Sequence, residues 1–332
     1  MNNKRYLIIP QNWLGDIIMT QCLIKKIHKE EPLSKIDLLV SKNFSPIVKR
    51  MPEVNNVIES CSKHKRFPLI NIIKKGLNLQ SRYDESIILS RSFKSSLIPF
   101  ISKIPIRTGE LGELRFFLIN NIVSFKKEER RISALRYSSM FKNKDPGIQE
   151  QLYPQLNKNE SNLQSIIAKH KININNKIIS IAPGAAFGIS KMWPVKKFIK
   201  LADKIEAMDN TQFLILGSSK EEMIGEQISK NRKNFINLCG QTSLDDLVDI
   251  LHLSTYCISN DSGIMHVAAA TKTKVIALFG STSPLFTPPL STNSQVIYKD
   301  IKCSPCFQKT CKYNHYDCMN NIHEDEVITY LK

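Results

Sequence analysis

The 332-residue sequence has no long hydrophobic run, since no apolar stretch approaches the ~20 residues needed to cross a membrane. Its first segment, MNNKRYLIIPQNW, begins with basic residues, but the apolar stretch YLII is shorter than the core of a signal peptide. These two absences predict a cytoplasmic protein. Its eight cysteines should then be mostly reduced.

Three functional motifs are also missing. The sequence contains no G-x-x-x-x-G-K-[ST] loop, which argues against a P-loop nucleotide site. It has no Asp-x-Asp pair of the kind that would hold a divalent metal against a diphosphate. No recognisable nucleic-acid module is present, nor a basic segment interleaved with stacking aromatics, so nucleic acid is not an expected partner.

Positive charge, by contrast, is abundant and unevenly distributed. The net charge is +17, and residues 1–165 hold 28 Lys and Arg against 15 Asp and Glu. A first half this basic indicates a polyanionic partner such as nucleic acid, an anionic membrane surface or an acidic glycan. The chain is also rich in Lys, Asn and Ile, so a compositional bias of its source is an alternative explanation.

Short apolar runs alternate with amphipathic stretches along the whole chain, which is typical of βαβ units around parallel sheets. Strands are predicted at 6–10, 36–41, 54–59, 86–90, 178–183, 212–217, 235–239, 256–259 and 275–280. Helices are predicted at 15–29, 45–50, 68–79, 94–102, 131–142, 195–207, 220–231, 243–253 and 263–270.

The length suits two domains, and the polar, Pro-containing stretch 145–176 is predicted to be the linker between them. We place the domains at 1–160 and 161–332. The segments YLIIPQNWLGD and IISIAPGAAFG both read as a buried strand followed by a Pro and a loop. This echo predicts an α/β fold of two doubly wound, Rossmann-like domains that face each other across a cleft.

Two loops of the second half indicate a phosphate site. In APGAAFGISKMWP, the glycines allow close backbone approach and Lys191 supplies a positive charge. In ISNDSGIMHVAAA, a strand ends at a helix start, where free N–H groups at Ser262 and Gly263 favour an anion. Asp261 could accept hydrogen bonds from sugar hydroxyls, and His266 could face the same cleft. The structural alternatives are an exposed lysine, a capping Asp261 and a packed His266.

The segment YLIIPQNWLGDIIMT places Asp16 at the start of the first predicted helix. A carboxylate there is favoured by the positive end of the helix, so Asp16 could simply cap it. It could also be a base beside a ligand, since open α/β sheets bind ligands at the carboxyl ends of their strands.

Together these motifs resemble a known family. NWLGDIIM, SFKSSLIPF, IPIRTG, PGAAFGISKMWP, NDSGIMHVAAA and GSTSPLFTPPLS have the order and spacing of bacterial ADP-heptose:lipopolysaccharide heptosyltransferases. SFKSSLIPF and the cysteine-rich tail are most similar to the branch that adds the second heptose of the inner core. The resemblance implies a GT-B fold, with an acceptor-binding first domain and an ADP-heptose-binding second domain. It also implies an inverting glycosyltransferase that requires no metal or other cofactor.

The resemblance further implies roles for individual residues. Asp16 corresponds to the catalytic base and Lys191 to the lysine that binds the donor phosphate and assists catalysis. Donor contacts are implied for Lys191, Glu222, Thr242, Asp261, Ser262, Gly263 and His266.

On the acceptor side, Lys94, Arg107 and Arg115 lie near motifs that resemble acceptor-binding ones. Arginine suits bidentate recognition of carboxylate and phosphate groups. The resemblance therefore implies an anionic lipopolysaccharide inner-core acceptor. It also implies peripheral contact of a cytoplasmic enzyme with the inner face of the inner membrane. Each basic residue could instead only solubilise the surface.

The tail CSPCFQKTCKYNHYDC spaces its four cysteines as C-x2-C-x4-C-x6-C. Four thiols this close together could hold a structural zinc, with Cys303, Cys306, Cys311 and Cys318 as ligands. The spacing departs from the paired C-x2-C arrangement, and reduced cysteines packing a surface loop are the alternative. Cys22, Cys61, Cys239 and Cys257 lie in apolar segments and are predicted to be core thiols.

Two alternatives to the second-heptose reaction remain open from the sequence. The same fold and donor could serve another acceptor, in first-heptose transfer or in heptosylation of a protein, because acceptor contacts are not readable from the motifs. A basic, non-catalytic binder of sugar nucleotides or nucleic acid is the alternative from another class. The presence of Asp16, Lys191 and Asp261 argues against it.

Overall fold

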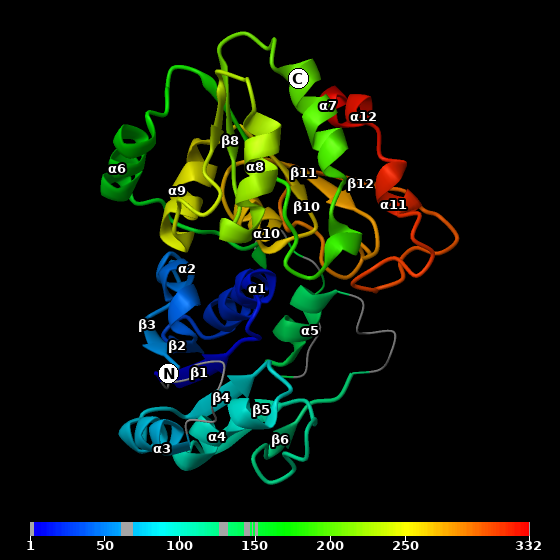
Figure 1. Cartoon of the computed structure of the whole chain (residues 1–332). Helices are drawn as coiled ribbons and strands as arrows, with labels where there is room; N and C mark the ends of the chain where they lie inside the picture. Colours follow the sequence, from blue (N-terminus) through cyan, green and yellow to red (C-terminus); the bar gives the residue numbers. More distant parts are fainter. Residues whose placement is uncertain are drawn as a thin grey trace. The chain divides into compact units, whose positions relative to one another are not determined.

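A computed structural model describes residues 3–60, 69–125, 132–142, 147, 149 and 152–331. The chain divides into two compact units, Met1–Gln155 (unit 1) and Leu156–Lys332 (unit 2), shown in Figure 1. The sequence places the boundary between residues 160 and 161, whereas the structure divides the chain between Gln155 and Leu156.

Unit 1 is built on a parallel six-stranded sheet with the strand order β3-β2-β1-β4-β5-β6. Its strands are β1 (Arg5–Ile9), β2 (Lys35–Val40), β3 (Asn56–Glu59), β4 (Glu85–Ile88), β5 (Ile106–Gly109) and β6 (Asn121–Ile122). Its helices are α1 (Leu14–Glu30), η1 (Lys42–Phe44), α2 (Ser45–Lys49), α3 (Leu69–Asn78), α4 (Phe93–Ile101) and α5 (Ser133–Ser139). α3 packs against α4, and α1 packs against α5.

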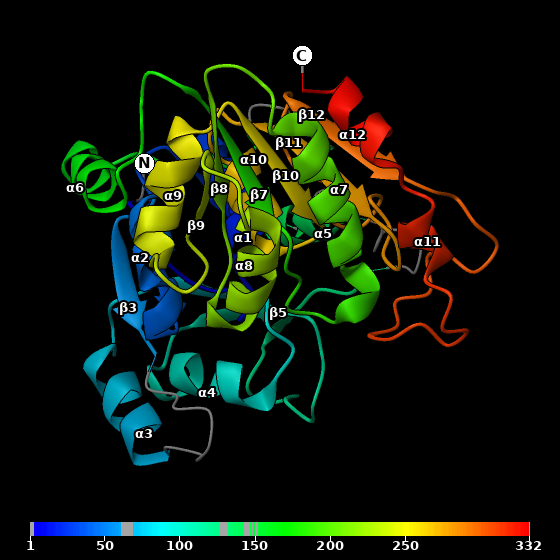
Figure 2. The same ribbon diagram turned by 45° about the horizontal axis from the view of Figure 1, so that its top comes forward.

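Unit 2 contains a second parallel six-stranded sheet, with the order β12-β11-β10-β7-β8-β9. Its strands are β7 (Lys177–Ala182), β8 (Thr211–Ile215), β9 (Phe235–Asn237), β10 (Tyr256–Asn260), β11 (Lys274–Phe279) and β12 (Ser294–Tyr298). Its helices are α6 (Glu160–His170), η4 (Ile189–Lys191), α7 (Val195–Ile205), η5 (Ser219–Glu221), α8 (Glu222–Ser229), α9 (Leu244–Leu253), α10 (Gly263–Ala269), α11 (Asp317–Asn320) and α12 (Glu324–Thr329). α7 packs against α8 and α12, whereas α9 packs against α6 and α10 (Figure 2).

The two sheets share one topology. When the strands of each unit are counted from its own start, both sheets have the order 3-2-1-4-5-6 of the doubly wound fold. The two similar segments noted in the sequence therefore contain the first strand of each unit, β1 and β7. In each unit the strand order reverses between the first and fourth strands, and ligands of such sheets bind at the carboxyl ends of these strands.

The central strands form because their apolar runs are continuous rather than alternating. In β1, the residues from Tyr6 to Ile9 are all buried, as parallel strands covered on both faces require. The core of unit 2 includes Trp193, whose ring lies edge-on to Phe198 with centroids 4.8 Å apart. Its indole N–H donates to the carbonyl of Ile322 at 3.2 Å, so the burial of this polar group is compensated.

All nine predicted strands are confirmed, each within two residues of its expected limits, and each predicted helix is present. Residues 68 and 131, at the expected starts of two helices, lie outside the described residues. β5, β6 and β12 were not predicted, because they are short or lie at the sheet edge and carry little apolar pattern.

The stretch 145–176, predicted to be linker and domain boundary, contains the division between Gln155 and Leu156, but it is not linker throughout. This stretch contains α6, which is capped by the side chain of Asn159 on the N–H groups of Ser161 and Asn162. Asn162 also donates to the buried carboxylate of Asp249 on α9, so α6 is part of unit 2. The short helices α11 and α12 were also not predicted. Among the described helices, none has both the length and the apolar composition needed to span a bilayer.

Candidate functional site

Asp16, Lys191 and Asp261 follow strands at which the order of their sheet reverses. In unit 1 the loop after β1 leads directly to Asp16. In unit 2 the loop after β7 carries Lys191, and β10 is followed at once by Asp261. Doubly wound sheets bind ligands at these strand ends, so the topology alone marks both places as candidate sites.

Unit 2 brings Lys191 and Asp261 into direct contact. Nζ of Lys191 donates to Oδ2 of Asp261 at 2.6 Å, and Oγ1 of Thr282 donates to the same oxygen at 2.5 Å. The Asp261 side chain is 4% exposed and that of Lys191 is 14% exposed. The pair is therefore largely desolvated, although a small part of the Lys191 side chain remains exposed. The capping alternative for Asp261 is wrong, since the N-cap of α10 is Ser262.

His266 lies on α10, near this ion pair, and is buried. Burial lowers its pKa to about 4, with Asp261 and Lys191 acting on it in opposite directions. Its imidazole is therefore neutral at pH 7. Ser262 makes no side-chain cap hydrogen bond, and its Oγ lies 3.2 Å from Oγ of Ser259. With Gly263 it forms the half-buried start of the helix.

The loop after β7 fits closely against neighbouring segments at its two glycines. A Cβ at Gly184 would lie 2.6 Å from Cγ of Glu221, and one at Gly188 would lie 2.5 Å from the carbonyl oxygen of Lys309. Glu221 also closes a capping box with Ser218. Glu221 thus has a structural role, which leaves Glu222 as the exposed acidic candidate at the start of α8.

Thr242 is half-buried and directly precedes Ser243, the N-cap of α9. It follows β9, which lies at the far edge of the sheet from β10. Glu222 and Thr242 are therefore presented by loops on the β8–β9 side of unit 2.

The cysteine-rich segment supports the Lys191 loop, a feature that the sequence analysis missed. The N–H of Ser190 donates to the carbonyl of Lys309 at 3.2 Å, and its hydroxyl donates to the carbonyl of Gln308. Ser281 donates in turn to the hydroxyl of Ser190 at 3.0 Å. These residues are about a hundred positions apart in sequence and belong to no shared motif, so the contact had no signal in the sequence.

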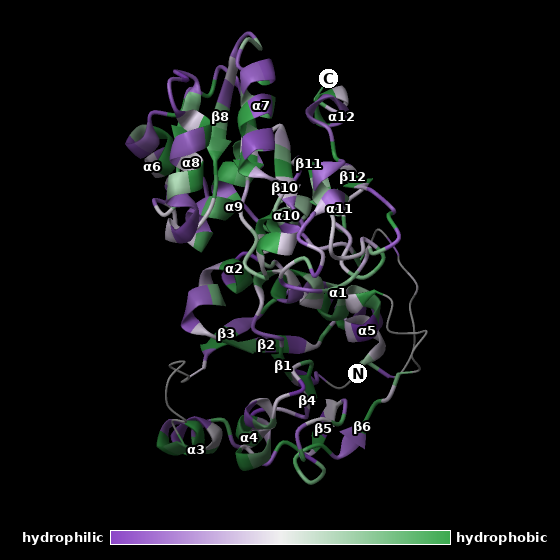
Figure 3. Ribbon diagram, turned by 45° about the vertical axis from the view of Figure 1, so that its right-hand side comes forward, coloured by the Kyte–Doolittle hydropathy of each residue, from purple (hydrophilic) through white to green (hydrophobic). Residues whose placement is uncertain are grey.

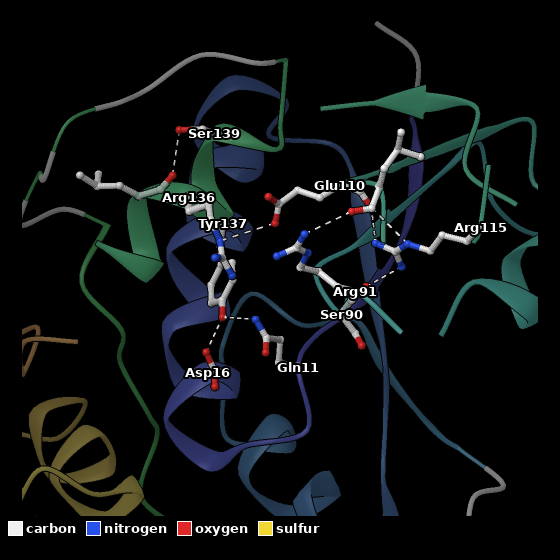
Figure 4. Close-up of polar contacts among 11 residues, drawn as sticks. Gln11, Asp16, Ser90, Arg91, Glu110, Arg115, Arg136, Tyr137 and Ser139 are labelled. Atoms are coloured by element: carbon white, nitrogen blue, oxygen red, sulfur yellow. Dashed lines mark hydrogen bonds and ion pairs between the residues drawn. The ribbon is translucent and has the colours of Figure 1, made fainter. Parts of the chain in front are cut away.

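In unit 1, Asp16 is the third residue of α1, whose N-cap is Trp13 (Figure 4). Oη of Tyr137 donates a short hydrogen bond to Oδ1 of Asp16, and Nε2 of Gln11 donates to Oη of Tyr137 at 3.0 Å. Tyr137 is fully buried. Burial and the adjacent Asp16 carboxylate raise its pKa well above the ordinary value, so the phenol stays protonated and acts as a donor.

Tyr137 lies on α5, more than a hundred residues after Asp16. The buried ammonium of Lys26 on α1 donates to the carbonyls of Ser138 and Phe141, each at 3.1 Å, and so fixes α5 against α1. The Arg136 guanidinium lies 5.5 Å from the centre of the Tyr137 ring. The sequence predicts this helix, but nothing in its pattern distinguishes Tyr137 from an ordinary core residue.

The three predicted acceptor-side residues differ in how they are presented. Lys94 is exposed on α4. Arg107 donates to the carbonyls of Leu118 at 2.9 Å and Ile104 at 2.6 Å. Arg115 is buried and donates to the carbonyls of Glu110 and Ser90, so its guanidinium tethers one loop to another (Figure 4). These contacts argue for structural roles of Arg107 and Arg115.

Unit 1 also has a cavity of about 660 Å³ between β3 and α3. Its lining includes Arg5, Asp37, Lys75 and Arg82, and none of the predicted site residues. The cavity lies along β3 at the edge of the sheet, whereas ligands of this fold bind where the strand order reverses, which in unit 1 is between β1 and β4. We therefore do not include it in the candidate site.

The tail cysteines are not grouped as a metal centre. Within the described ranges, no three His, Cys, Asp or Glu side chains are arranged to hold a metal ion. Cys318 is buried, and burial is the main cause that raises the pKa of its thiol to about 11. Of the predicted core thiols, Cys22, Cys239 and Cys257 are buried, and Cys61 lies outside the described residues.

Comparison with known proteins gives consistent matches. The family model of glycosyltransferase family 9 (heptosyltransferase) matches residues 72–317. The chain is 34% identical over 304 residues to lipooligosaccharide heptosyltransferase 2 of Haemophilus influenzae, covering 88% of this chain and 87% of that one. It is 34% identical over 307 residues to lipopolysaccharide heptosyltransferase 2 of Escherichia coli, with coverage of 88% and 87%.

The solved structure of E. coli ADP-heptose lipopolysaccharide heptosyltransferase II matches with a TM-score of 0.85 at 31% identity. The match covers 98% of this chain and 97% of that one. This likeness extends over both units and shows the GT-B fold.

Proposed function

The chain belongs to glycosyltransferase family 9, the heptosyltransferases, and we propose that it moves a heptose from ADP-heptose to the first heptose of the lipopolysaccharide inner core. The observation that carries this proposal is the likeness along nearly the whole chain to heptosyltransferase II. Membership of an enzyme family also leaves the nucleic-acid-binding alternative without support.

We propose that unit 2 binds the donor. Lys191 and the N–H groups at Ser262 and Gly263 would contact the diphosphate, because preorganised donors are most effective where charge develops as ADP leaves. Asp261 would hold Lys191 and accept hydrogen bonds from the sugar. Glu222 and Thr242 would contact the nucleoside. The partial exposure of the Lys191 side chain and its contact with Asp261 support this role.

We propose that Asp16 is the general base. It would accept the proton of the acceptor hydroxyl as the oxygen bonds to the anomeric carbon. The bond from that carbon to the β-phosphate oxygen breaks, and ADP leaves with the electron pair, which inverts the configuration. The transition state would resemble an oxocarbenium ion, as in other glycosyl chemistry. Tyr137 would be a positioning residue that orients the Asp16 carboxylate.

The reaction is proposed to proceed without a metal or other cofactor. Lys191 provides the positive charge that a divalent cation would otherwise bring to the diphosphate, and the sequence has no Asp-x-Asp motif to hold such a cation. Zinc at Cys303, Cys306, Cys311 and Cys318 is not supported by their arrangement.

We propose that the basic unit 1 receives an anionic inner-core acceptor at the inner face of the inner membrane, through peripheral contact. The excess of Lys and Arg in the first half of the chain supports this partner. Lys94 is the predicted acceptor-side residue whose exposure best suits a direct contact. Arg107 and Arg115 would act indirectly, by fixing the loops that surround α4.

The test is ADP release from ADP-heptose by the purified protein in EDTA, with inner-core acceptors that carry no heptose or one heptose. We expect turnover only with the one-heptose acceptor, and turnover that is strongly reduced by Asp16→Asn. Turnover only with the heptose-free acceptor would assign first-heptose transfer. ADP-heptose binding without turnover on either would leave another acceptor, such as a protein, and would reject the proposed reaction.

A further inference from the structure

Hydrophobic side chains are unevenly exposed along the chain. Among the described residues, half of the large hydrophobic side chains that are exposed lie between Leu69 and Ile122 in unit 1. Monomeric proteins rarely expose contiguous apolar patches unless these bind a partner or a membrane. The exposure of these apolar side chains therefore indicates a partner or a membrane that covers them.

α3 contributes the first part of this surface. Ile70, Ile73 and Leu77 have the i, i+3, i+7 spacing of one helix face and are all exposed, Ile70 to 69%. The opposite face, which includes Ile72 and Gly76, is buried. A helix that is apolar on both its inner and outer faces is typical of an element with a second apolar environment outside the fold.

α4 and the loop after β5 continue the surface. Phe93 and Phe100 are exposed on α4, and Leu114 and Phe117 are exposed to 85% and 88% in the loop. Figures 1 and 3 show α3, α4, β5 and β6 in succession along the same edge of unit 1, and Figure 3 shows hydrophobic bands on α3 and α4.

Side-chain contacts join these elements into one surface. Oγ of Ser102, at the end of α4, donates to the carbonyl of Gly76 on α3 at 2.9 Å. The Arg107 guanidinium lies 5.5 Å from the centre of the Phe100 ring and also donates to the carbonyl of Leu118. The N–H of Phe93 donates to the carboxylate of Glu113 at 2.8 Å. The exposed apolar groups thus belong to elements that are in contact with one another.

The charge around these groups is mostly positive. The exposed basic residues between 69 and 125 are Lys74, Arg82, Arg91, Lys94 and Lys103, whereas the exposed acidic ones are Asp84 and Glu113. Apolar side chains that enter the acyl boundary, surrounded by lysines that reach the headgroups, are the features by which peripheral proteins bind anionic bilayers.

We propose that α3, α4 and the loop after β5 form a lipid-docking surface through which unit 1 rests on an anionic bilayer. The inference rests on the proposed function only in that the acceptor lies at a membrane. A second copy of the chain is a poorer occupant, because a symmetric contact through this surface would oppose lysines to lysines. The lipid-docking surface accounts for both the apolar exposure and the sign of the charge.

The test is co-sedimentation of the full chain with vesicles of phosphatidylcholine alone or with phosphatidylglycerol. We expect binding to the anionic vesicles, and a loss of about tenfold or more in partition coefficient for Ile70→Asp with Phe117→Asp. Ile174→Asp, which changes an isoleucine of unit 2 exposed to 59%, is the control and should bind like the parent. Lys74→Ser with Lys103→Ser should weaken binding several-fold, and only to anionic vesicles.

Insertion has its own readout. With Phe117→Trp, the emission of the new indole should shift to the blue on anionic vesicles and be quenched by brominated acyl chains. Equal binding by the Ile70→Asp, Phe117→Asp variant and the Ile174→Asp control would overturn the proposal. The proposal would also be overturned if the parent does not bind vesicles and instead forms a dimer. In that case the Ile70→Asp, Phe117→Asp variant would be monomeric.

The outcome is separable from that of the proposed reaction. The Ile70→Asp, Phe117→Asp variant should keep full turnover on a delipidated, water-soluble acceptor and lose turnover on an acceptor embedded in vesicles. Vesicle binding by a protein without heptose transfer would retain the lipid-docking surface and reject the reaction. Heptose transfer by a protein that does not bind vesicles would retain the reaction and reject the lipid-docking surface.

Discussion

Unit 1 and unit 2 have the same strand order but different chemistry where that order reverses. In unit 1 the carboxylate of Asp16 receives a neutral donor, Tyr137, from a helix far along the chain. In unit 2 the carboxylate of Asp261 is compensated by the charge of Lys191 and by Thr282. The two candidate sites thus differ in the donors that reach their carboxylates: a buried phenol in unit 1, and an ammonium group with a hydroxyl in unit 2.

The surfaces of the two units also differ, in their charge and in their exposed apolar side chains. Unit 1 holds the larger share of the positive charge and the continuous lipid-docking surface. Unit 2 has a smaller excess of basic residues, and some of them form exposed ion pairs, such as Lys204 with Asp325. The two units thus share one strand order but differ in their loops and surface residues, which is where function is carried in such folds.

The largest expected effect separates proton transfer from donor binding. Asp16→Asn should lower kcat by about a thousandfold, since removing a general base costs on the order of 10²–10⁴. The affinity for ADP should stay unchanged, because unit 2 is intact. Stopped assays of turnover and calorimetric titration of ADP measure the two quantities. Asp37→Asn, which removes another tyrosine-bonded carboxylate of unit 1, is the control and should retain turnover.

The central strands and their loops were predictable because buried parallel strands appear in the sequence as continuous apolar runs. The same runs end at the strand ends where Asp16, Lys191 and Asp261 lie, so the two candidate sites could be located from topology alone. The short strands β5 and β6 and the edge strand β12 could not, because they carry little apolar pattern of their own. The helix α6 could not either, because it is held by neighbours such as Asp249.

The second effect tests whether Lys191 binds ligand or only balances Asp261. Lys191→Ala should weaken ADP binding and reduce turnover by about a hundredfold, the scale of losing one preorganised donor at a developing charge. It also leaves Asp261 buried without its counterion, which destabilises unit 2.

The double variant Lys191→Ala with Asp261→Asn removes that unpaired charge. Thermal unfolding should recover towards that of the parent, while ADP binding should stay weak. Full recovery of ADP affinity in the double variant would mean that Lys191 serves only as the counterion of Asp261. Lys204→Ala, which breaks an exposed ion pair of the same unit, is the control for the loss of a lysine.

The third effect concerns stability and belongs to unit 2. The pKa of His266 is lowered from 6.5 to about 4, so the unfolded chain binds the additional proton between these values. The contribution of the buried, neutral His266 to the free energy of unfolding is complete above pH 6.5 and is lost as the pH falls towards 4. Between pH 7 and 5 this loss is about 2 kcal/mol.

Urea unfolding of His266→Gln followed across this range should therefore show a flatter pH dependence than that of the parent. His323→Gln, which changes an exposed histidine of the same unit, should keep the parent slope. An unchanged slope for His266→Gln would show that the buried imidazole is not neutral in the folded protein.

The sequence could not predict the contact of Tyr137 with Asp16 or the contact of Ser190 with the cysteine-rich tail. Both join segments distant in the chain through a few hydrogen bonds, and neither residue type is unusual in its own segment. Helix α5 is recognisable from its sequence, but which of its side chains meets Asp16 depends on how Lys26 fixes the helix on α1. Such pairings follow from packing, so the sequence could predict the elements but not the pair.

The smallest expected effect tests whether Tyr137 positions the base or only fills the core. Tyr137→Phe keeps the buried ring and removes the hydrogen bond to Asp16, so kcat/KM should fall by about tenfold, the scale of one hydrogen bond to a charged group. A hydrogen bond to a carboxylate favours its ionised form, so its loss should move the acidic limb of the pH–rate profile to higher pH.

Tyr83→Phe is the control, since it removes the equivalent bond to Asp37, 2.7 Å long, from another buried tyrosine of unit 1. A similar loss of stability in both variants, with a shifted limb only for Tyr137→Phe, is the result expected of a positioning residue. If the limb stays in place, Tyr137 contributes to packing alone, and the difference between the two carboxylates arises elsewhere in unit 1.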